Sequence, residues 1–279
     1  MKKVIDKILP LAYGTYFNTT AIFSKEEASE KAFSLFCTPR KGRVLPEQIE
    51  FLDQAKSDRI KVKDLEVQTY HWKGNKDTVL LLHGWESNAY RWRNLISFLK
   101  NEEYNIIAFD APAHGNSSGS IFNVHLYTEC TQAIVDNYKP KIVIGHSVGG
   151  MNALYHQQKY PTEEIEKIVT IGSPSNLKDI MLQYQNMLKF NDVVMQGLDD
   201  HLMDRFGFRM HEFATSNFQG HLPKKGLIVH DELDAIAPFS ASLEVHKTWE
   251  NSTLFKTKGF GHSMHQNEVN HRIMDFIKS

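Results

Sequence analysis

One short stretch, Ile142–Gly150, constrains the fold of this chain more than any other. It begins as an apolar, β-branched run, turns through Gly145-His146-Ser147-Val148-Gly149, and continues in a helical pattern. A Gly-x-Ser-x-Gly sequence between a buried strand and a helix is typical of a nucleophile elbow. A Cβ two residues before or after the serine would clash, because the chain passes close to itself there. The stretch therefore predicts a serine in strained backbone at the carboxyl edge of a parallel sheet, where ligands bind in open α/β folds.

The segments around this stretch predict such a sheet. Residues 78–82 form a continuous apolar run, the signature of a strand buried on both faces. Further strands are predicted at 105–109, 165–171, 225–230 and 252–256, and the strands alternate with helical patterns. Residues 61–72 alternate in polarity and predict one or two antiparallel edge strands. Strands that alternate with helices imply parallel pairing and right-handed crossovers. We therefore expect an α/β fold with a mostly parallel central sheet flanked by helices.

Two segments do not follow this alternation. Residues 1–60 carry helical patterns and helix-start signals instead of strand patterns. Residues 173–223 are rich in Met, Phe and Leu, and the segment is too long and too apolar for a plain loop. We expect an N-terminal helical extension at 1–60, a core made of 61–172 and 224–279, and a helical cap insertion at 173–223 that covers the site.

A base must accompany Ser147, because a serine hydroxyl is a weak nucleophile until another group takes its proton. His262 is favoured among the 14 histidines because it lies in the loop after the last predicted strand, at 252–256, and closely follows Gly259 and Gly261. His265 is the rival, but it falls inside the predicted closing helix at 263–278. We expect Ser147 to act as nucleophile and His262 as general base and then general acid.

A carboxylate must orient that histidine. Three acids follow the predicted strand at 225–230, namely Asp231, Glu232 and Asp234. Asp234 is favoured over the other two because it stands late in the turn, four residues before Pro238. We expect Asp234 to be the buried carboxylate that fixes the imidazole.

Backbone amides must stabilise the oxyanion. We expect one from Val148, at the start of the elbow helix, and one from Trp85, in the loop after the predicted strand at 78–82. His83, in the same loop, is expected to brace it rather than to take part in catalysis. The substrate pocket is expected to draw on this loop and on the insertion, through His83, Trp85, Met181, Tyr184 and Phe206.

Together these motifs resemble the α/β-hydrolase fold superfamily, in particular its serine-nucleophile, esterase-like and lipase-like members. The matching pieces cover about residues 61–279: residues 81–85, residues 109–117, residues 145–150, Asp234 with Pro238, and Gly261 with His262. Ala113 stands where the family often has glycine, and Trp85 stands where some carboxylesterases have glycine. The resemblance implies a structural turn for Asp110 and His114, with no part in the chemistry.

We expect from this a serine hydrolase that cleaves a carboxylic ester, or a thioester or amide, of a small and largely apolar substrate. A carbon–carbon bond hydrolase or a peptidase of the same fold is the alternative. A binding protein that keeps the pocket and has little turnover is the alternative of another class. The superfamily's dehalogenases and epoxide hydrolases have aspartate at the elbow, so Ser147 argues against both.

The composition limits which partners and which cellular compartment the chain is expected to have. The net charge is −1, from 32 basic and 33 acidic residues, so nothing directs the chain to nucleic acid. Two cysteines form no metal spacing and no disulfide framework, which favours the cytoplasm. We expect no metal and no cofactor, no integral membrane segment, no signal peptide, and either a monomer or a homodimer.

Overall fold

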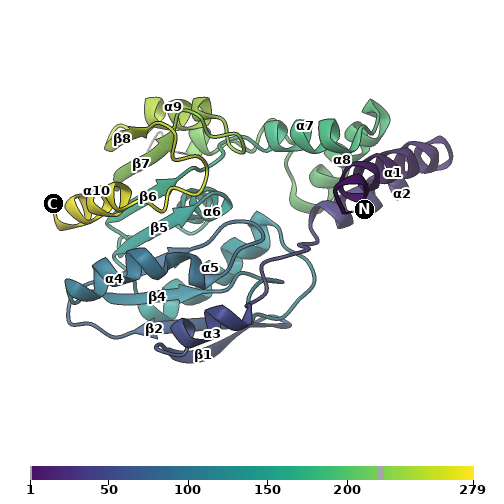
Figure 1. Cartoon of the computed structure of the whole chain (residues 1–279). Helices are drawn as coiled ribbons and strands as arrows, with labels where there is room; N and C mark the ends of the chain where they lie inside the picture. The colour runs from purple at the N-terminus through teal and green to yellow at the C-terminus, as the bar shows by residue number, and fades with distance from the viewer. Residues whose placement is uncertain (1, 219–222) are drawn as a thin grey trace. The chain divides into compact units, whose positions relative to one another are not determined.

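The computed structural model describes residues 2–218 and 223–279 of the chain (Figure 1). Met1 and residues 219–222, which the predicted extension and insertion include, lie outside the described residues. The chain divides into two compact units. The helical unit contains Met1–Thr38 and Asn176–Ala214, and the sheet unit contains Pro39–Ser175 and Thr215–Ser279.

The sheet unit is built on one eight-stranded sheet in the order β1-β2-β4-β3-β5-β6-β7-β8. Its strands are β1 (Lys56–Val62), β2 (Leu65–Trp72), β3 (Thr78–Leu82), β4 (Asn105–Phe109), β5 (Ile142–His146), β6 (Lys167–Ile171), β7 (Lys225–Asp231) and β8 (Ser252–Thr257). β1 pairs antiparallel with β2, and β2 pairs antiparallel with β4. The pairs from β4 through β3 to β8 are parallel. The predicted mostly parallel sheet, with its antiparallel edge, is confirmed.

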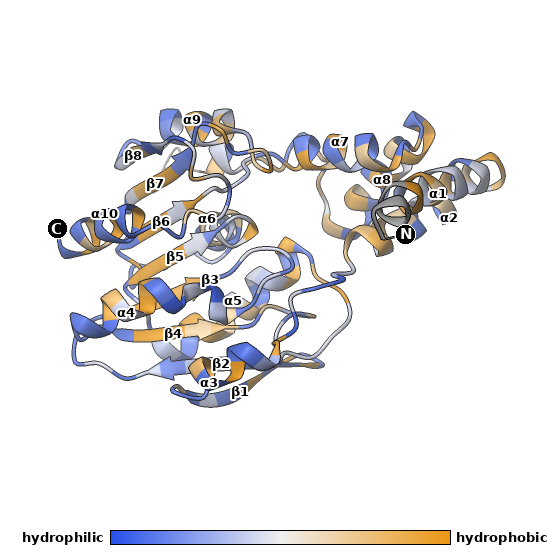
Figure 2. Ribbon diagram, in the orientation of Figure 1, coloured by the Kyte–Doolittle hydropathy of each residue, from blue (hydrophilic) through white to orange (hydrophobic). Residues whose placement is uncertain are grey.

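Helices cover both faces of this sheet (Figure 1). One face packs against α3 (Pro46–Leu52), α4 (Arg93–Asn101) and α10 (Asn267–Lys278). The other packs against α5 (Val124–Tyr138), α6 (Val148–Lys159) and α9 (Phe239–Thr248). On β3, Val79 and Leu81 enter the first cluster while Leu80 and Leu82 enter the second. The central strands therefore carry apolar side chains on both faces, and Figure 2 shows largely hydrophobic colours along β4 and β5.

The sheet unit begins earlier than the predicted boundary at residue 61. It begins at Pro39 and includes α3 and β1. Leu52 of α3 is buried in the core, whereas β1 is an edge strand whose side chains are mostly exposed. An edge strand of this kind lacks the apolar signature of a buried one, which is why the sequence pattern placed residues 56–60 outside the sheet.

The helical unit contains most of the two segments that were predicted to lie outside the sheet, the N-terminal extension and the insertion. Its helices are α1 (Lys2–Phe23), α2 (Lys25–Phe36), α7 (Leu177–Leu188) and α8 (Asp192–Phe206). A Cβ on Gly14 of α1 would lie 1.8 Å from the carbonyl oxygen of Leu188, so the two chain segments meet closely. The Tyr184 hydroxyl donates to the Ala32 carbonyl at 3.0 Å. The extension and the insertion, predicted as separate parts, therefore share one core.

Candidate active site

Ser147 lies between β5 and α6 in the strained backbone that the elbow motif predicts. Its φ of 55° and ψ of −125° are unusual for a residue with a side chain. A Cβ on Gly145 would lie 2.3 Å from the carbonyl oxygen of Gly149, and a Cβ on Gly149 would lie 2.1 Å from that of Leu82. The glycines are therefore required by crowding. The Ser147 amide donates to the Ile171 carbonyl at 2.8 Å, which ties the elbow to the end of β6.

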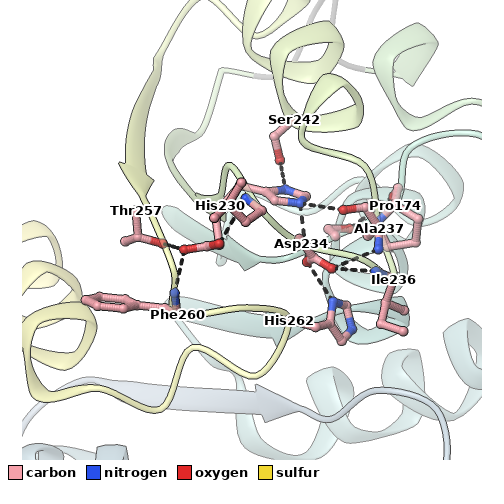
Figure 3. Close-up of polar contacts among 12 residues, drawn as sticks. Pro174, His230, Asp234, Ile236, Ala237, Ser242, Thr257, Phe260 and His262 are labelled. Carbon is pink, nitrogen blue, oxygen red and sulfur yellow. Dashed lines mark hydrogen bonds and ion pairs between the residues drawn. The ribbon is translucent and has the colours of Figure 1, made fainter.

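His262 and Asp234 form a hydrogen-bonded pair (Figure 3). His262 Nδ1 lies 2.7 Å from Asp234 Oδ2, and the Asp234 side chain is buried. Burial alone would raise the pKa of Asp234, but hydrogen bonds from His230, His262 and the amides of Ile236 and Ala237 hold it well below its usual range. Asp234 is therefore ionised and accepts the Nδ1 proton, which leaves Nε2 as the acceptor of the His262 ring.

The elbow and this pair meet at the same edge of the sheet. The Ile171 carbonyl accepts the hydrogen bond from the Ser147 amide, and the next residue, Gly172, has a φ of +55°. A Cβ on Gly172 would lie 3.4 Å from both Asp234 Oδ2 and His262 Nδ1. The side chain of His146, next to Ser147, packs on the His262 ring with centroids 4.8 Å apart. The structure thus brings Ser147, Asp234 and His262 into one neighbourhood.

His230 is a second histidine on Asp234, and the sequence reasoning missed it. Its buried ring places Nε2 3.0 Å from the Ala237 carbonyl and 3.5 Å from Asp234 Oδ2 (Figure 3). Nδ1 lies 2.6 Å from the Ser242 hydroxyl, so the network assigns the proton to Nε2 and makes Nδ1 the acceptor. The one feature of the sequence that could have pointed to His230 is its position in the strand, four residues before Asp234.

The rival residues have other surroundings. Asp231 accepts from the Thr257 hydroxyl and the Phe260 amide, both at 2.8 Å, so it supports the loop that carries His262. Glu232 is exposed. His265 lies before α10 rather than inside a helix, because α10 begins only at Asn267. Burial, with the charges of two nearby arginines, lowers the pKa of His265 to about 4.

Two side chains hold the backbone of the His262 loop. His146 Nε2 lies 2.9 Å from the His262 carbonyl, and Arg91 Nη2 donates to the Ser263 carbonyl at 2.8 Å. Burial, together with the positive charge of Arg91, lowers the pKa of His146 well below its usual range. His146 is therefore neutral, and because a carbonyl can only accept, Nε2 carries its proton. This bond links the elbow directly to the loop of the proposed base.

The loop after β3 passes against Ser147. A Cβ on Gly84 would lie 2.9 Å from Ser147 Cβ, so only glycine fits there. The next residue, Trp85, packs its indole edge-on against His114 and Phe122, with centroids 5.8 and 5.3 Å away. Val148 opens α6, whose N-terminal end carries a positive partial charge. The amides of Trp85 and Val148 stay the predicted donors to an oxyanion.

His83 was predicted both to brace this loop and to line the substrate pocket, and its contacts are those of a buried brace. Its Nε2 accepts from the Ala111 amide at 2.9 Å, and its Nδ1 lies 2.7 Å from the Gly84 carbonyl. Burial lowers the pKa of His83 to about 3, so the ring is neutral. With both nitrogens bonded to backbone, the predicted contact between His83 and substrate has no support.

The turn at residues 110–117 has the structural character that the resemblance implied. Asp110 is buried and accepts from the Ala89 amide, the Tyr70 hydroxyl and the Asn116 amide at 2.8–2.9 Å. Ala113 adopts a φ of 64°, in the left-handed region that glycine occupies most easily. The turn thus keeps a conformation that suits glycine in spite of the alanine.

Three predicted pocket residues belong to the helical unit and are engaged within it. Met181 is buried, and the Tyr184 hydroxyl is bonded to α2. The Phe206 ring packs against Phe33 and Phe208 at centroid distances of 6.0 and 5.9 Å. These contacts explain the residues as parts of a helical core, so their assignment to a substrate pocket stays a prediction.

Within the described residues, no group of three or more His, Cys, Asp or Glu side chains could hold a metal ion. In the same part of the chain, no helix has the length and apolar character that crossing a membrane requires.

Comparisons with known proteins agree with this architecture. A family model for the alpha/beta hydrolase fold matches residues 77–205. An uncharacterized hydrolase of Bacillus subtilis, YugF, is 24% identical over 267 residues, which cover 79% of this chain and 97% of that protein. A bifunctional esterase/perhydrolase of Acinetobacter calcoaceticus is 24% identical over 251 residues, covering 71% and 90%. The crystal structure of a bromoperoxidase from Bacillus anthracis superposes with a TM-score of 0.64 at 19% identity, covering 80% of this chain and 100% of that one.

Proposed function

We propose that this chain, which has the alpha/beta hydrolase fold, is a serine hydrolase that cleaves a carboxylic ester through an acyl-enzyme. The observation that carries the proposal is the pairing of His262 with the ionised Asp234 at the sheet edge where Ser147 occupies the strained elbow. A hydroxyl, an imidazole and a carboxylate in this chain order are the parts that acyl transfer requires.

In the proposed reaction, His262 Nε2 takes the proton of Ser147 as Oγ attacks the ester carbonyl carbon. Asp234 stabilises the imidazolium that forms, and the amides of Val148 and Trp85 donate to the oxyanion. The imidazolium then gives its proton to the departing alcohol as the C–O bond breaks, and the acyl group stays on Ser147. Water, deprotonated by His262, attacks the acyl-enzyme, and the carboxylic acid leaves as Ser147 regains its proton.

The surroundings of the site favour a small and largely apolar substrate. Leu233 and Ile236 flank Asp234 and are 61% and 60% exposed, so apolar side chains lie at its rim. The Acinetobacter relative is named an esterase, which favours an ester over a thioester or amide. We further propose that the insertion, with Met181, Tyr184 and Phe206, acts as a cap, and that the protein works in the cytoplasm, where its two buried, unpaired thiols would stay reduced.

The test is hydrolysis of p-nitrophenyl esters of increasing acyl length by the wild type and by Ser147→Ala. Removal of the nucleophile should lower kcat by at least about a thousandfold with the melting temperature retained. Ser97→Ala, which removes an exposed hydroxyl on α4, is the matched control and should keep full activity. A fluorophosphonate probe should label the wild type and Ser97→Ala but not Ser147→Ala.

Equal hydrolysis by wild type and Ser147→Ala would disprove the nucleophile assignment. Labelling of Ser147 without turnover of any ester would instead indicate a hydrolase of narrow specificity. If the protein bound an ester tightly but showed no labelling and no turnover, the binding-protein alternative would be favoured.

A further inference from the structure

The longest described helix, α1, presents a face without charge. No Asp, Glu, Lys, Arg or His occurs between Ile8 and Phe23. The exposed residues of this stretch are apolar or carry a hydroxyl: Ile8, Leu9, Leu11, Ala12, Thr15, Tyr16, Thr19, Ile22 and Phe23. Their spacing of three and four residues places them on one side of the helix, and we call this set the uncharged arc. Ile22 and Phe23 are 78% and 86% exposed, which is unusual for such large apolar side chains.

The orientation of α1 within the helical unit is fixed by its opposite side. Gly14 lies against the Leu188 carbonyl, and the Phe17 ring is buried, 6.5 Å from that of Phe190. The Asn18 amide donates to the Lys189 carbonyl at 3.3 Å and accepts from the Asn191 amide at 2.7 Å. These contacts occupy both polar groups of the Asn18 side chain. The uncharged arc is therefore left on the side turned away from α7 and α8.

The hydroxyls of the arc are satisfied within the helix. Thr15 donates to the Leu11 carbonyl and Thr19 to the Thr15 carbonyl, both at 2.9 Å. Donation to a carbonyl one turn earlier is how threonine is accommodated where no water is available. The Tyr16 hydroxyl, at the edge of the arc, is 2.5 Å from Lys31 Nζ, and this ammonium also lies 5.1 Å from the Tyr16 ring centre. An aromatic ring beside a lysine is suited to a boundary between apolar and aqueous surroundings.

We propose that the uncharged arc docks on the surface of a lipid bilayer, with α1 lying in the plane of the interface. Lys2, Lys3 and Lys7 precede the arc in the sequence with a single acid, Asp6, and this excess of basic residues favours anionic headgroups. An interfacial helix buries one apolar face by about 5–10 Å and needs no shape-complementary partner. The proposal is independent of the assignment of Ser147, since it concerns a different part of the chain.

The polar groups of the arc favour a lipid surface over a second copy of this chain. A protein interface carries about one hydrogen bond per 100–200 Å². The Thr15 and Thr19 hydroxyls already donate to carbonyls of their own helix. An interfacial helix needs no such partner groups, and the lysines that precede the arc add electrostatic attraction to anionic headgroups.

The experiment is flotation of the full chain with vesicles of phosphatidylcholine alone or of phosphatidylcholine and phosphatidylglycerol in equal amounts. The wild type should float with the anionic vesicles. Ile22→Glu/Phe23→Glu, which places two carboxylates on the arc, should lower binding at least about tenfold. Leu45→Glu/Ile49→Glu changes two exposed apolar residues of the sheet unit, 49% and 47% exposed, and should bind like the wild type. Thr19→Val should also bind at least as well as the wild type.

Three results would overturn the proposal. The wild type could fail to float with either kind of vesicle, or the Ile22→Glu/Phe23→Glu variant could float as the wild type does. Ultracentrifugation could also show a dimer that this variant abolishes, which would assign the arc to a second copy. Ser147→Ala should float normally whether or not it hydrolyses esters, so failure of the lipid proposal and failure of the hydrolase proposal give different results.

Discussion

The carboxylate of Asp234 is buried and accepts hydrogen bonds from two histidines and two backbone amides. Asp234→Asn removes the charge that stabilises the imidazolium and disturbs the tautomer of His262. We expect kcat on p-nitrophenyl esters to fall by about 10³–10⁴-fold, as loss of this charge does in serine proteases. Steady-state kinetics beside a thermal melt would check this expectation.

The control for this variant is Glu232→Gln, which neutralises an exposed acid of the same turn and should keep wild-type kcat. A kcat for Asp234→Asn within tenfold of the wild type would remove Asp234 from the proposed mechanism.

Single residues could be predicted where the motif demands a particular backbone. Ser147 could be found because Gly145 and Gly149 have no room for a Cβ. The pairing of Asp234 with His262 could be anticipated from their places after predicted strands. His230, His146 and Arg91 could not, since their roles depend on contacts between segments far apart in the sequence. In a chain with 14 histidines, residue type alone does not single them out.

At the scale of elements, the loop between β8 and α10 is anchored at several points. Asp231 binds the Phe260 amide, His146 the His262 carbonyl, and Arg91 the Ser263 carbonyl. His146→Ala should lower kcat by about 10–100-fold with little change in KM, because the ring fixes the backbone of His262 rather than the substrate.

His146→Gln supplies an amide N–H for the same carbonyl, so we expect it to recover most of the lost kcat. Both variants would be compared in kcat, KM and melting temperature. A fall in melting temperature with unchanged kcat would show that His146 only stabilises the fold.

Elements buried on both faces were the easiest to predict. β3, β4, β5 and β7 each contain a run of apolar residues whose side chains enter the cores on both faces of the sheet. β1 was missed in part because an exposed edge strand has no such signature. The predicted start of the closing helix at residue 263 was wrong, since Met264 has a φ of 46°, which a right-handed helix excludes.

At the scale of the whole molecule, buried neutral histidines make the stability depend on pH. Burial lowers the pKa of His156 to about 4, below the unfolded value of about 6.5. The unfolded chain therefore binds more protons below pH 6.5, so the contribution of His156 is complete above that pH and declines as the pH falls. Between pH 7 and pH 5 the wild type should lose roughly 2 kcal/mol of unfolding free energy through this residue.

His156→Gln should lose correspondingly less between the two pH values in urea titrations. His271→Gln changes an exposed histidine of α10 and should follow the wild type. The same pH dependence in His156→Gln as in the wild type would contradict the buried, neutral state of His156.

The pairing of α1 and α2 with α7 and α8 was beyond the reach of sequence patterns. Each helix could be predicted from its own periodicity and end signals, such as Ser24 and Asn191, which cap α2 and α8. Which helices share a core is decided by close approaches such as that of Gly14 to Leu188, and a single sequence does not reveal them.

The helices of the helical unit are synthesised at two separate times, because the unit is discontinuous in the sequence. A ribosome releases α1 and α2 first and must then add the whole of β1–β6 before α7 begins at Leu177. At about 5–20 residues per second, the wait is on the order of ten seconds. For that time Phe17 and Ala28, buried in the finished protein, lack the contacts of α7 and α8. The nascent chain thus carries α1 and α2 without α7 and α8 throughout the synthesis of β1–β6, and in this interval their apolar side chains are open to chaperones.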